Sequence, residues 1–304
     1  MSEMKVIFIV NPISGTKSKK HIISLIPKYF ADTEYTAEIK YTEYAGHAEK
    51  LANEAAKDGA IAVVAVGGDG TVNEVARGIV HTQSALGIIP CGSGNGLARH
   101  LGIPMSAKGA METLRKMNIR DCDYGKICGH PFFCTAGVGF DAEVSDTFAR
   151  AGKRGLITYL KTTIGVGLKY KGYEYEIEIE NDGKKEKVSS DLYWLITAGN
   201  AAQYGNDFFI TPKASVCDGK LDINLWTKFN KLTSPIVGIQ LAIAKIYHNP
   251  HVHIVSCDKV TIHRQEEGPI QWDGDPSHGP KDVVLECVPK GIKMVVGKPK
   301  RNIL

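Results

Sequence analysis

The first 120 residues alternate between strand-like runs and segments with helical periodicity. The strand-like runs fall at 5–10, 35–42, 61–66 and 85–90, and the helical segments at 18–30, 47–59, 71–81 and 96–101. A continuous apolar run is typical of a parallel strand that is covered on both faces. The alternation therefore predicts a parallel α/β sheet over residues 1–122.

Beyond residue 120 the pattern changes to short segments of alternating or β-branched residues. Residues 173–180, YEYEIEIE, have a strict period of two, which gives a strand one buried and one wet face. Many such segments in succession are typical of a sandwich or barrel. Helical patterns at 142–169 and 231–248 interrupt them. We expect a second, mainly β domain over residues 123–293.

The overall charge argues against a nucleic-acid partner. The chain has 304 residues, with 37 lysines and arginines against 33 acidic residues and a formal net charge of only +4. That excess suits a protein that visits anionic surfaces. No apolar run of about 18 residues occurs, and the N-terminal run ends in Asn-Pro, as a first strand would rather than a signal peptide. Seven cysteines without a C-x-x-C pair predict free thiols and a cytoplasmic protein.

Three glycine-rich turns follow strands of the first domain. They are NPISGTKS at 11–18, GGDGT at 67–71 and PCGSGNG at 90–96. Glycine lets successive backbone N–H groups point inward around an anion, and a following helix adds its positive end. Any one of these turns could simply be tight, but three at the carboxyl edge of one sheet favour a phosphate site. Asp69, inside the second turn, is suited to act through a metal on a phosphate chain.

Other phosphate and catalytic motifs are absent from the sequence. It has no G-x-x-x-x-G-K-[ST] loop and no strict G-x-G-x-x-G, so neither a P-loop enzyme nor an ordinary dinucleotide fold is supported. It also lacks a G-x-S-x-G elbow and an H-E-x-x-H zinc motif.

The ordered set NPISG, GGDGTVNEV and PCGSGN resembles the diacylglycerol kinase catalytic family, which includes sphingosine and ceramide kinases and bacterial lipid kinases. The resemblance continues through 211–223, TPKASVCDGKLDI, and 272–275, WDGD. It implies an ATP-dependent lipid kinase with an α/β nucleotide domain, a β-sandwich lipid-substrate domain and the active site in a cleft between them. It also implies that residues 294–304 return to the first domain.

The resemblance carries a set of nucleotide-binding residues onto the first domain. They are Asn11, Pro12, Ser14, Gly15, Thr42, Gly68, Asp69, Gly70, Thr71, Val72, Asn73, Glu74 and Ser93. The glycine turns support this assignment independently, whereas Thr42 rests on the resemblance alone.

The catalytic and metal residues are assigned in the same way. The WDGD turn resembles the family's Asp-Gly-Glu, so Asp273 is expected to accept the proton of the attacking hydroxyl, with Asp275 in the Glu position. An Asp-Gly hairpin turn without a catalytic role is the alternative. Asp123 would link the catalytic carboxylate to the metal network, and Asp69 is also counted among the catalytic residues. The residues implied for a structural Mg²⁺ loop are Ser215, Asp218 and Lys220.

Fewer residues of the sequence bear on the acceptor than on the kinase chemistry. Gly96 stands where many bacterial diacylglycerol kinases carry Asp, and PCGSGNGLA looks more like the sphingosine kinase version. We expect diacylglycerol as acceptor, giving phosphatidic acid, with a sphingoid base or ceramide as the alternative. NAD kinase, which shares GGDGT, and a catalytically silent lipid or nucleotide sensor are more distant alternatives.

A membrane contact is expected as well. Residues 149–172 place Leu156, Leu160, Ile164 and Leu168 at intervals of four among basic side chains. This segment either packs its apolar stripe on the β domain or rests peripherally on an anionic membrane. A homodimer is possible, because a sheet edge could pair with a second copy.

Overall fold

The computed structural model describes residues 4–14, 19–151, 156–227 and 233–298. It divides into two compact units, Met1–Cys122 with Lys290–Leu304 and Asp123–Pro289. The last segment joins the first unit at Lys290, earlier than the expected residue 294. The reason is that strand β17 (Asp282–Val295) continues without a break until Lys293 and Met294 pair with the first unit's sheet.

The first unit is the parallel α/β layer that the apolar runs predict. Its strands lie in the order β17, β4 (Ala85–Pro90), β3 (Ala62–Gly67), β1 (Met4–Val10) and β2 (Tyr35–Tyr41). Every neighbouring pair is parallel. β3 and β4 are buried along their whole length, which explains their continuous apolar sequences.

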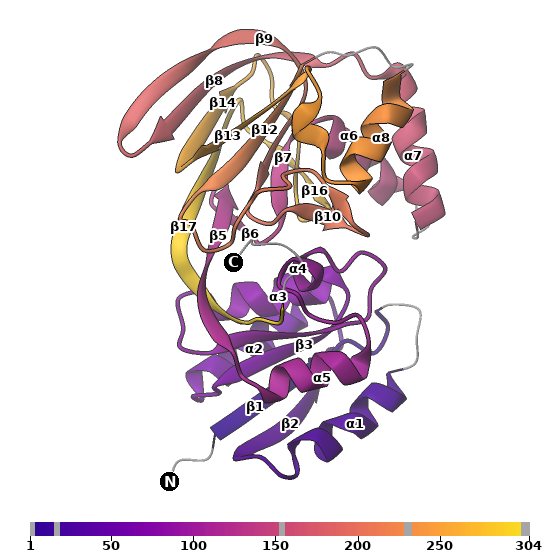
Figure 1. Cartoon of the computed structure of the whole chain (residues 1–304), viewed down its shortest axis with the longest axis vertical. Helices are drawn as coiled ribbons and strands as arrows, with labels where there is room; N and C mark the ends of the chain where they lie inside the picture. Colours follow the sequence, from indigo (N-terminus) through magenta and orange to yellow (C-terminus); the bar gives the residue numbers. More distant parts are fainter. Residues whose placement is uncertain (1–3, 15–18, 152–155, 228–232, 299–304) are drawn as a thin grey trace. The chain divides into compact units, whose positions relative to one another are not determined.

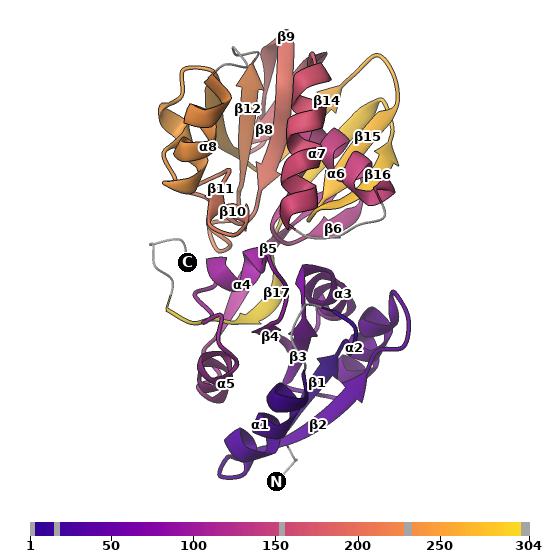
Figure 2. The same ribbon diagram turned by 90° about the vertical axis from the view of Figure 1, so that its right-hand side faces the viewer.

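Helices cover both faces of this sheet (Figures 1 and 2). On one face α2 (His47–Lys57) packs against α3 (Asp69–Ile79), and on the other α1 (Lys20–Phe30) packs against α5 (Ala107–Arg115). The short α4 (Gly96–His100) follows β4. The sequence reading missed α5, although the hydroxyl of Ser106 caps its start by accepting from the Gly109 N–H.

The second unit is built from antiparallel strands, as expected of a β sandwich. Its strands are β5 (Ile119–Ile127), β6 (His130–Phe132), β7 (Thr135–Gly139), β8 (Tyr173–Asn181), β9 (Lys184–Gly199), β10 (Gln203–Gly205), β11 (Phe208–Phe209), β12 (Leu221–Thr227), β13 (Val252–Cys257), β14 (Lys259–His263), β15 (Gly268–Trp272), β16 (Asp275–Gly279) and the first part of β17. The main sheet runs β16-β15-β7-β9-β8-β14-β17. The long β9 also pairs with β12, which pairs with β13.

Strand β8 confirms the period-two prediction. Tyr175, Ile177 and Ile179 are buried in the sandwich core. Glu176 and Glu178 point the other way and pair with lysines of β9. The buried side chains hold the strand in register, because solvent-accessible ion pairs of this kind contribute little to stability.

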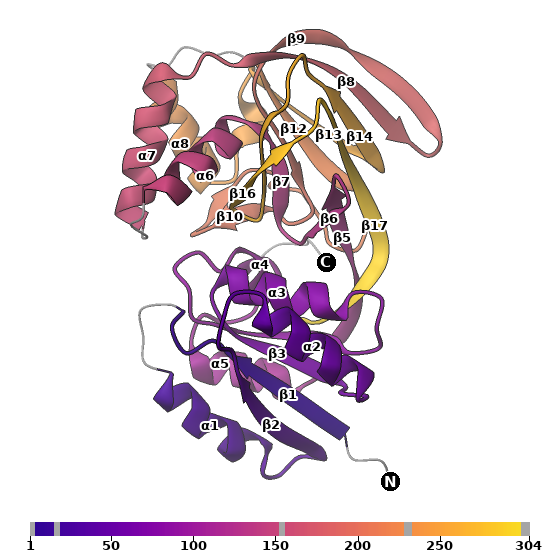
Figure 3. The same cartoon turned by 180° about the vertical axis from the view of Figure 1, so that it is seen from behind.

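Three helices cover one side of the second unit (Figures 1 and 3). The pattern at 142–169 divides into α6 (Phe140–Arg150) and α7 (Leu156–Lys169). The pattern at 231–248 yields α8 (Ser234–Ala242) and a single 3₁₀ turn, η2 (Ile246–His248). Beneath them lies an apolar cluster that includes Trp194 and Trp226. Within the described ranges, no helix is both long and apolar enough to cross a membrane.

Candidate active site

The three glycine turns meet at one edge of the first unit's sheet. β1, β3 and β4 are adjacent and parallel, so their carboxyl ends lie side by side. The Asn11 N–H donates to Val66 O over 3.2 Å, and the Cys91 N–H donates to Gly67 O over 2.7 Å. The turns therefore begin as continuations of the strand ladder, at the edge where parallel sheets bind ligands.

Asn11 joins the first turn to the second. Its side-chain nitrogen Nδ2 donates to the Thr71 hydroxyl over 3.2 Å, and its side-chain oxygen Oδ1 accepts from the N–H groups of Ile13 and Ser14. Pro12 is exposed beside it. Gly15, the remaining predicted residue of this turn, lies outside the described residues.

Asp69 joins the second turn to the third. Its two carboxylate oxygens accept from the Asn95 N–H and the Gly96 N–H, each over 2.9 Å. It is the first residue of α3 and at the same time holds the start of α4. A half-buried carboxylate in this position stabilises both turns, and it retains lone pairs that a metal ion or a water molecule can use.

The third turn requires glycine and asparagine. A Cβ on Gly92 would lie 2.9 Å from the Gly68 Cα, so the second and third turns can approach this closely only without that side chain. Asn95 has φ of 52°, and its side chain bridges back to both the N–H and the carbonyl of Gly92. Ser93 is exposed at the tip of the turn. Sequence reasoning missed Asn95, although it stands between two glycines.

The other residues predicted to wrap the phosphates have different environments. Gly70 is exposed and Gly68 half-buried, whereas Thr71, Val72 and Asn73 are buried in the packing of α3. The Glu74 carboxylate accepts from the Ala48 N–H over 3.1 Å, so it serves the start of α2. Thr42 is also buried, and its N–H donates to Val10 O.

The solvent-accessible part of the second and third glycine turns is suited to bind an anion. Gly68, Asp69, Gly70 and Ser93 are the predicted residues of the second and third turns that reach solvent. Gly68 caps α3 without a side-chain acceptor for the first N–H groups of the helix. Those N–H groups, at the positive end of an eleven-residue helix, are the donors that bind phosphate in nucleotide sites.

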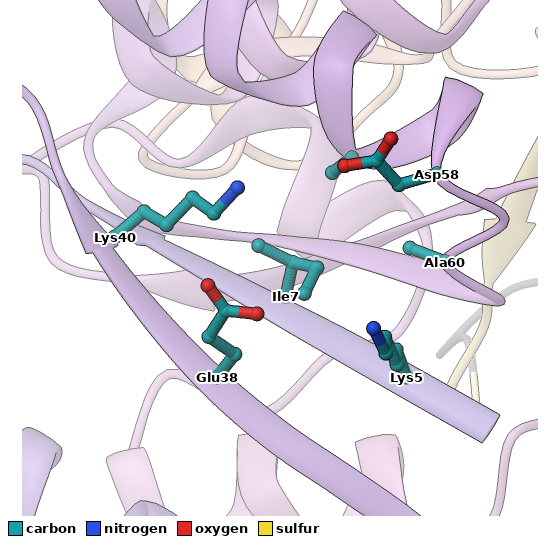
Figure 4. Close-up of a pocket in the computed structure, with 7 residues that line it drawn as sticks. Lys5, Ile7, Glu38, Lys40, Asp58 and Ala60 are labelled. Carbon is teal, nitrogen blue, oxygen red and sulfur yellow. The ribbon is translucent and has the colours of Figure 1, made fainter. Parts of the chain in front are cut away.

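A small cavity elsewhere in the first unit does not have this character (Figure 4). It measures about 30 Å³ and lies toward the amino ends of β1 and β3. Its lining residues are Lys5, Ile7, Glu38, Lys40, Ala55, Asp58 and Ala60. Two cations and two carboxylates in a space for about one water molecule do not form a nucleotide site.

In the second unit, Asp123 organises the loop predicted to bind a structural metal. It is buried in β5, and its carboxylate accepts from the Gly219 N–H over 2.7 Å. Its own N–H donates to Val216 O over 2.6 Å. Burial and the nearby charge of Asp123 raise the pKa of Asp218. The Asp123 carboxyl group of β5 thus lies near the Asp218 carboxyl group of the loop.

Lys220 closes the same loop. Its N–H donates to the Asp218 carboxylate over 3.1 Å, and its ammonium bonds to Asp182 at 2.9 Å and Asp258 at 2.7 Å. Hydrogen bonds to Asp258 and Asp182 raise the pKa of Lys220, so this side chain stays cationic. It therefore can offer only its carbonyl to a metal. The Ser215 hydroxyl accepts from the Cys217 N–H.

The donor set of this loop fits Mg²⁺ but not a metal held wholly by side chains. In the part of the chain that the structure describes, no three His, Cys, Asp or Glu side chains gather as metal ligands. Mg²⁺ commonly takes one or two carboxylates and completes its shell with carbonyls, waters and phosphates. Asp218 would supply a carboxylate of this kind.

Asn200 connects Asp123 to the segment that contacts the WDGD turn (residues 272–275), which we call the acidic turn. It is fully buried at the end of β9, and its amide nitrogen donates to Asp123 O over 3.1 Å and to Phe133 O over 2.9 Å. Its N–H donates to Cys134 O. Sequence reasoning missed Asn200, although a polar residue directly after the buried strand end ITAG was a signal for it.

Asp273, in the acidic turn, binds the segment of residues 133–135. Its carboxylate accepts from the N–H groups of Phe133, Cys134 and Thr135, at 2.9, 2.7 and 3.0 Å. Burial raises the pKa of Asp273 to about 6, although the three donors oppose the rise. Its φ is 50°, an unusual backbone conformation for a residue other than glycine. Asp273 therefore anchors the acidic turn to the strand beside it.

Asp275 differs from Asp273 in its surroundings. It is exposed, begins β16 and pairs across the turn with Trp272. Of the two acids in WDGD, Asp275 is the more exposed, whereas Asp273 is half-buried. The expectation that Asp273 accepts the proton therefore meets a physical objection, since its oxygens already serve three backbone donors.

Comparison with known proteins agrees with both units. Residues 5–127 match the model of the diacylglycerol kinase catalytic domain, and residues 134–296 match that of the YegS C-terminal NAD kinase beta sandwich-like domain. A diacylglycerol kinase of Bacillus subtilis (strain 168) is 31% identical over 279 residues, covering 88% of each chain.

Solved structures show the same fold. The crystal structure of a diacylglycerol kinase from Bacillus anthracis str. Sterne has a TM-score of 0.73 at 24% identity, covering 98% of both chains. A second solved chain from the same strain has a TM-score of 0.77 at 24% identity, covering 97% of this chain and 95% of its own. Family models that together span most of the sequence, with a relative similar over nearly its full length, decide the membership. The chain belongs to the diacylglycerol kinase catalytic-domain family, and it is a kinase.

Proposed function

We propose that this kinase transfers the γ-phosphate of ATP to the free hydroxyl of diacylglycerol, giving phosphatidic acid and ADP. The observation that carries the proposal is the Asp69 bridge, which fixes two glycine turns around the open start of α3. The similarity to a Bacillus subtilis diacylglycerol kinase over 88% of the chain supports the choice of acceptor.

In the proposed reaction the first unit holds the triphosphate. The N–H groups at the start of α3 and in the glycine turns bind its oxygens, and Asp69 faces it with a carboxylate. A bound Mg²⁺ would neutralise charge on the phosphate chain and polarise the transferred phosphoryl group. Asp69 is the residue of this edge suited to hold it, because Asp69 is the acidic side chain within the accessible turns.

The acidic turn supplies the proton acceptor. As the lipid oxygen forms its bond to the γ-phosphorus, the bond between that phosphorus and the β,γ-bridging oxygen breaks, and ADP leaves. The hydroxyl proton passes to a carboxylate. We assign this role to Asp275 rather than Asp273, because Asp275 is exposed whereas Asp273 is bound by three backbone N–H groups.

The acceptor is tested by a panel. Purified enzyme, ATP and Mg²⁺ would be incubated with micelles that each carry one of diacylglycerol, monoacylglycerol, sphingosine or ceramide, with NAD as the water-soluble acceptor, and products identified by mass spectrometry. We expect phosphatidic acid as the dominant product. Phosphorylation of sphingosine or ceramide alone would move the acceptor to the sphingoid class, and phosphorylation of NAD alone would contradict the lipid assignment.

We expect Mg²⁺ to stabilise the second unit through the Asp218 loop. A ligand at about 100 times its dissociation constant stabilises a fold by about 2.7 kcal/mol. The Tm should therefore rise by several degrees with Mg²⁺ and fall again with EDTA, and Asp218→Asn should abolish the rise. Asp32→Asn, at an exposed acid of the first unit, is the control. An unchanged Mg²⁺ response in Asp218→Asn would contradict the site.

The peripheral membrane contact also belongs to this proposal. Ile164 and Leu168 of α7 are 65% and 71% exposed, so the alternative that they pack on the β domain is wrong for these two. α7 packs instead through Val166, and Tyr170 just after the helix lies in the same cluster. Two of the basic residues of the 149–172 segment, Lys153 and Arg154, and the side chains of Leu156 and Leu160 lie outside the described residues.

Helix α8 adds a second apolar face on the same side of the unit (Figure 1). Ile236, Ile239 and Ile243 are 56%, 60% and 52% exposed, while Val237 packs beneath the helix on the cluster that α7 also covers. Neither 156–169 nor 234–248 contains an acidic residue, and lysines flank both exposed faces. An apolar face with cationic flanks favours an anionic lipid surface.

We expect Ile236→Ser combined with Ile239→Ser to weaken binding to phosphatidylglycerol vesicles by about tenfold or more, because two apolar side chains no longer enter the bilayer surface. Cosedimentation measures this, with Ile119→Ser, at an exposed site on β5, as the control. Unchanged vesicle binding would contradict the membrane assignment. A loss of dimers in the double variant would assign the face to a homodimer instead.

A further inference from the structure

A buried carboxylate outside the predicted site holds the acidic turn indirectly. Asp141 stands at the start of α6 and is 8% exposed. One of its oxygens accepts from the Thr197 hydroxyl at 2.7 Å, the Gln271 amide at 2.9 Å and the Tyr204 hydroxyl at 3.1 Å. The other accepts from the Ala142 N–H at 2.8 Å. Burial raises the pKa of Asp141 to about 6, although these four donors oppose the rise.

Gln271 links Asp141 to the acidic turn. It lies in β15 and is 1% exposed, and its side-chain oxygen accepts from the Gly274 N–H over 3.2 Å. A glutamine amide has one donating and one accepting end. Because its nitrogen faces the Asp141 carboxylate, its oxygen must face Gly274. Asp141 therefore dictates which end of Gln271 reaches the turn.

The position of Gly274 gives the link a consequence. Gly274 is the residue between Asp273 and Asp275, with φ of 87°, so its peptide sets the direction in which the chain enters β16. Asp273 anchors one side of the turn through Phe133, Cys134 and Thr135. The Gln271 oxygen anchors the other side, next to Asp275.

We propose that Asp141 is a positioning residue, which acts through Gln271 to fix the Gly274 peptide and hence the place of Asp275. The proposal rests on the function assigned to Asp275 above. Asp141 touches neither substrate nor phosphate in this role. Its effect is to keep one amide from turning over, since a reversed amide would set two donors, its NH₂ and the Gly274 N–H, against each other.

Exchange of the two side chains gives the sharpest test. Gln271→Glu alone places two carboxylates side by side at Asp141 and should lower kcat at pH 8 by about tenfold to a hundredfold, with the KM for ATP unchanged. Adding Asp141→Asn restores a donor opposite the new carboxylate, whose second oxygen can accept from Gly274. The double variant should therefore recover most of the lost kcat.

Variants that remove either side chain provide a second test. Asp141→Ala and Gln271→Leu should each lower kcat to a similar extent, and the double variant should lose no more than either single one, because both act through one link. Asn224→Ala is the matched control. Asn224 is a fully buried amide of the same unit that donates to Ile210 O, so its loss should lower the Tm and leave kcat unchanged.

Hydrogen exchange at the Gly274 amide provides a readout that does not depend on activity. The amide should be protected in the wild type and in the exchanged pair, and unprotected in Asp141→Ala and Gln271→Leu. Unchanged exchange in those two variants would overturn the proposal. Faster exchange with normal kcat would overturn it too, while leaving the lipid kinase assignment intact. A wild type that transfers no phosphate to lipid would instead defeat the proposed function, with the exchange pattern still decisive for the link.

Discussion

Asp69→Ala is expected to lower kcat for lipid phosphorylation by about 10³-fold, which corresponds to about 4 kcal/mol of transition-state stabilisation. The substitution removes the acceptor of the Asn95 and Gly96 N–H groups, and with it the carboxylate proposed to hold a metal on the phosphate chain. Initial rates at saturating ATP and Mg²⁺ measure the effect.

Asp58→Ala is the matched control for Asp69. Asp58 belongs to the same unit and follows α2, but it lines the small cavity with Lys5 and Lys40 (Figure 4). Its removal should leave kcat within about twofold of the wild type, as surface substitutions away from a site usually do. Similar losses in both variants would show a general loss of fold. Normal kcat in Asp69→Ala would remove Asp69 from the mechanism.

Asp275→Ala is expected to lower kcat by about 10²- to 10⁴-fold without a change in Tm, since a general base contributes in that range and Asp275 is exposed. Asp273→Ala should differ by lowering the Tm. It leaves three backbone N–H groups without their acceptor, at a cost of about 1–3 kcal/mol for each buried donor.

Thermal melts and initial rates of the two variants decide between the acids. A normal kcat in Asp275→Ala, together with an inactive Asp273→Ala that melts like the wild type, would return the base to Asp273. An inactive Asp275→Ala with normal Tm, beside a destabilised Asp273→Ala, would support the roles proposed here.

The parts of the fold that depend on local periodicity could be predicted from the sequence. Residues 62–66 are buried on both faces of the sheet and residues 173–180 on one face, and the two hydrophobic patterns predict these environments. Helix α5 was missed because its sequence, AKGAMETLR, includes a glycine and follows no apolar strand signal. The second unit ends at residue 289 rather than at the expected residue 293, because β17 pairs within both units and no local signal marks where its partner changes.

The candidate site could be predicted only as far as its motifs are contiguous. GGDGT identified Asp69, but its partners Asn95 and Gly96 stand more than 25 residues away. The WDGD motif led to Asp273, rather than Asp275, as the expected proton acceptor. They differ because Asp273 meets N–H groups about 140 residues earlier in the chain, a contact that only the fold creates.

The link from Asp141 to Gly274 was beyond sequence reasoning for the same reason. Its middle residue, Gln271, stands 130 residues from Asp141, and nothing in the sequence around either residue marks the contact. Glu74 shows, in contrast, that a residue within a motif can stabilise the fold instead of forming the site. It belongs to the GGDGTVNEV motif, yet its side chain serves the start of α2.

The central claim is that the chain is a lipid kinase, and the most direct test is transfer of radiolabelled γ-phosphate. Labelled ATP and Mg²⁺ would be incubated with wild type or Asp69→Ala in the presence of both diacylglycerol micelles and NAD, followed by organic extraction. We predict label in the lipid phase that depends on Asp69 and on Mg²⁺. Label confined to NAD in the aqueous phase, or lipid label unaffected by Asp69→Ala, would contradict the account.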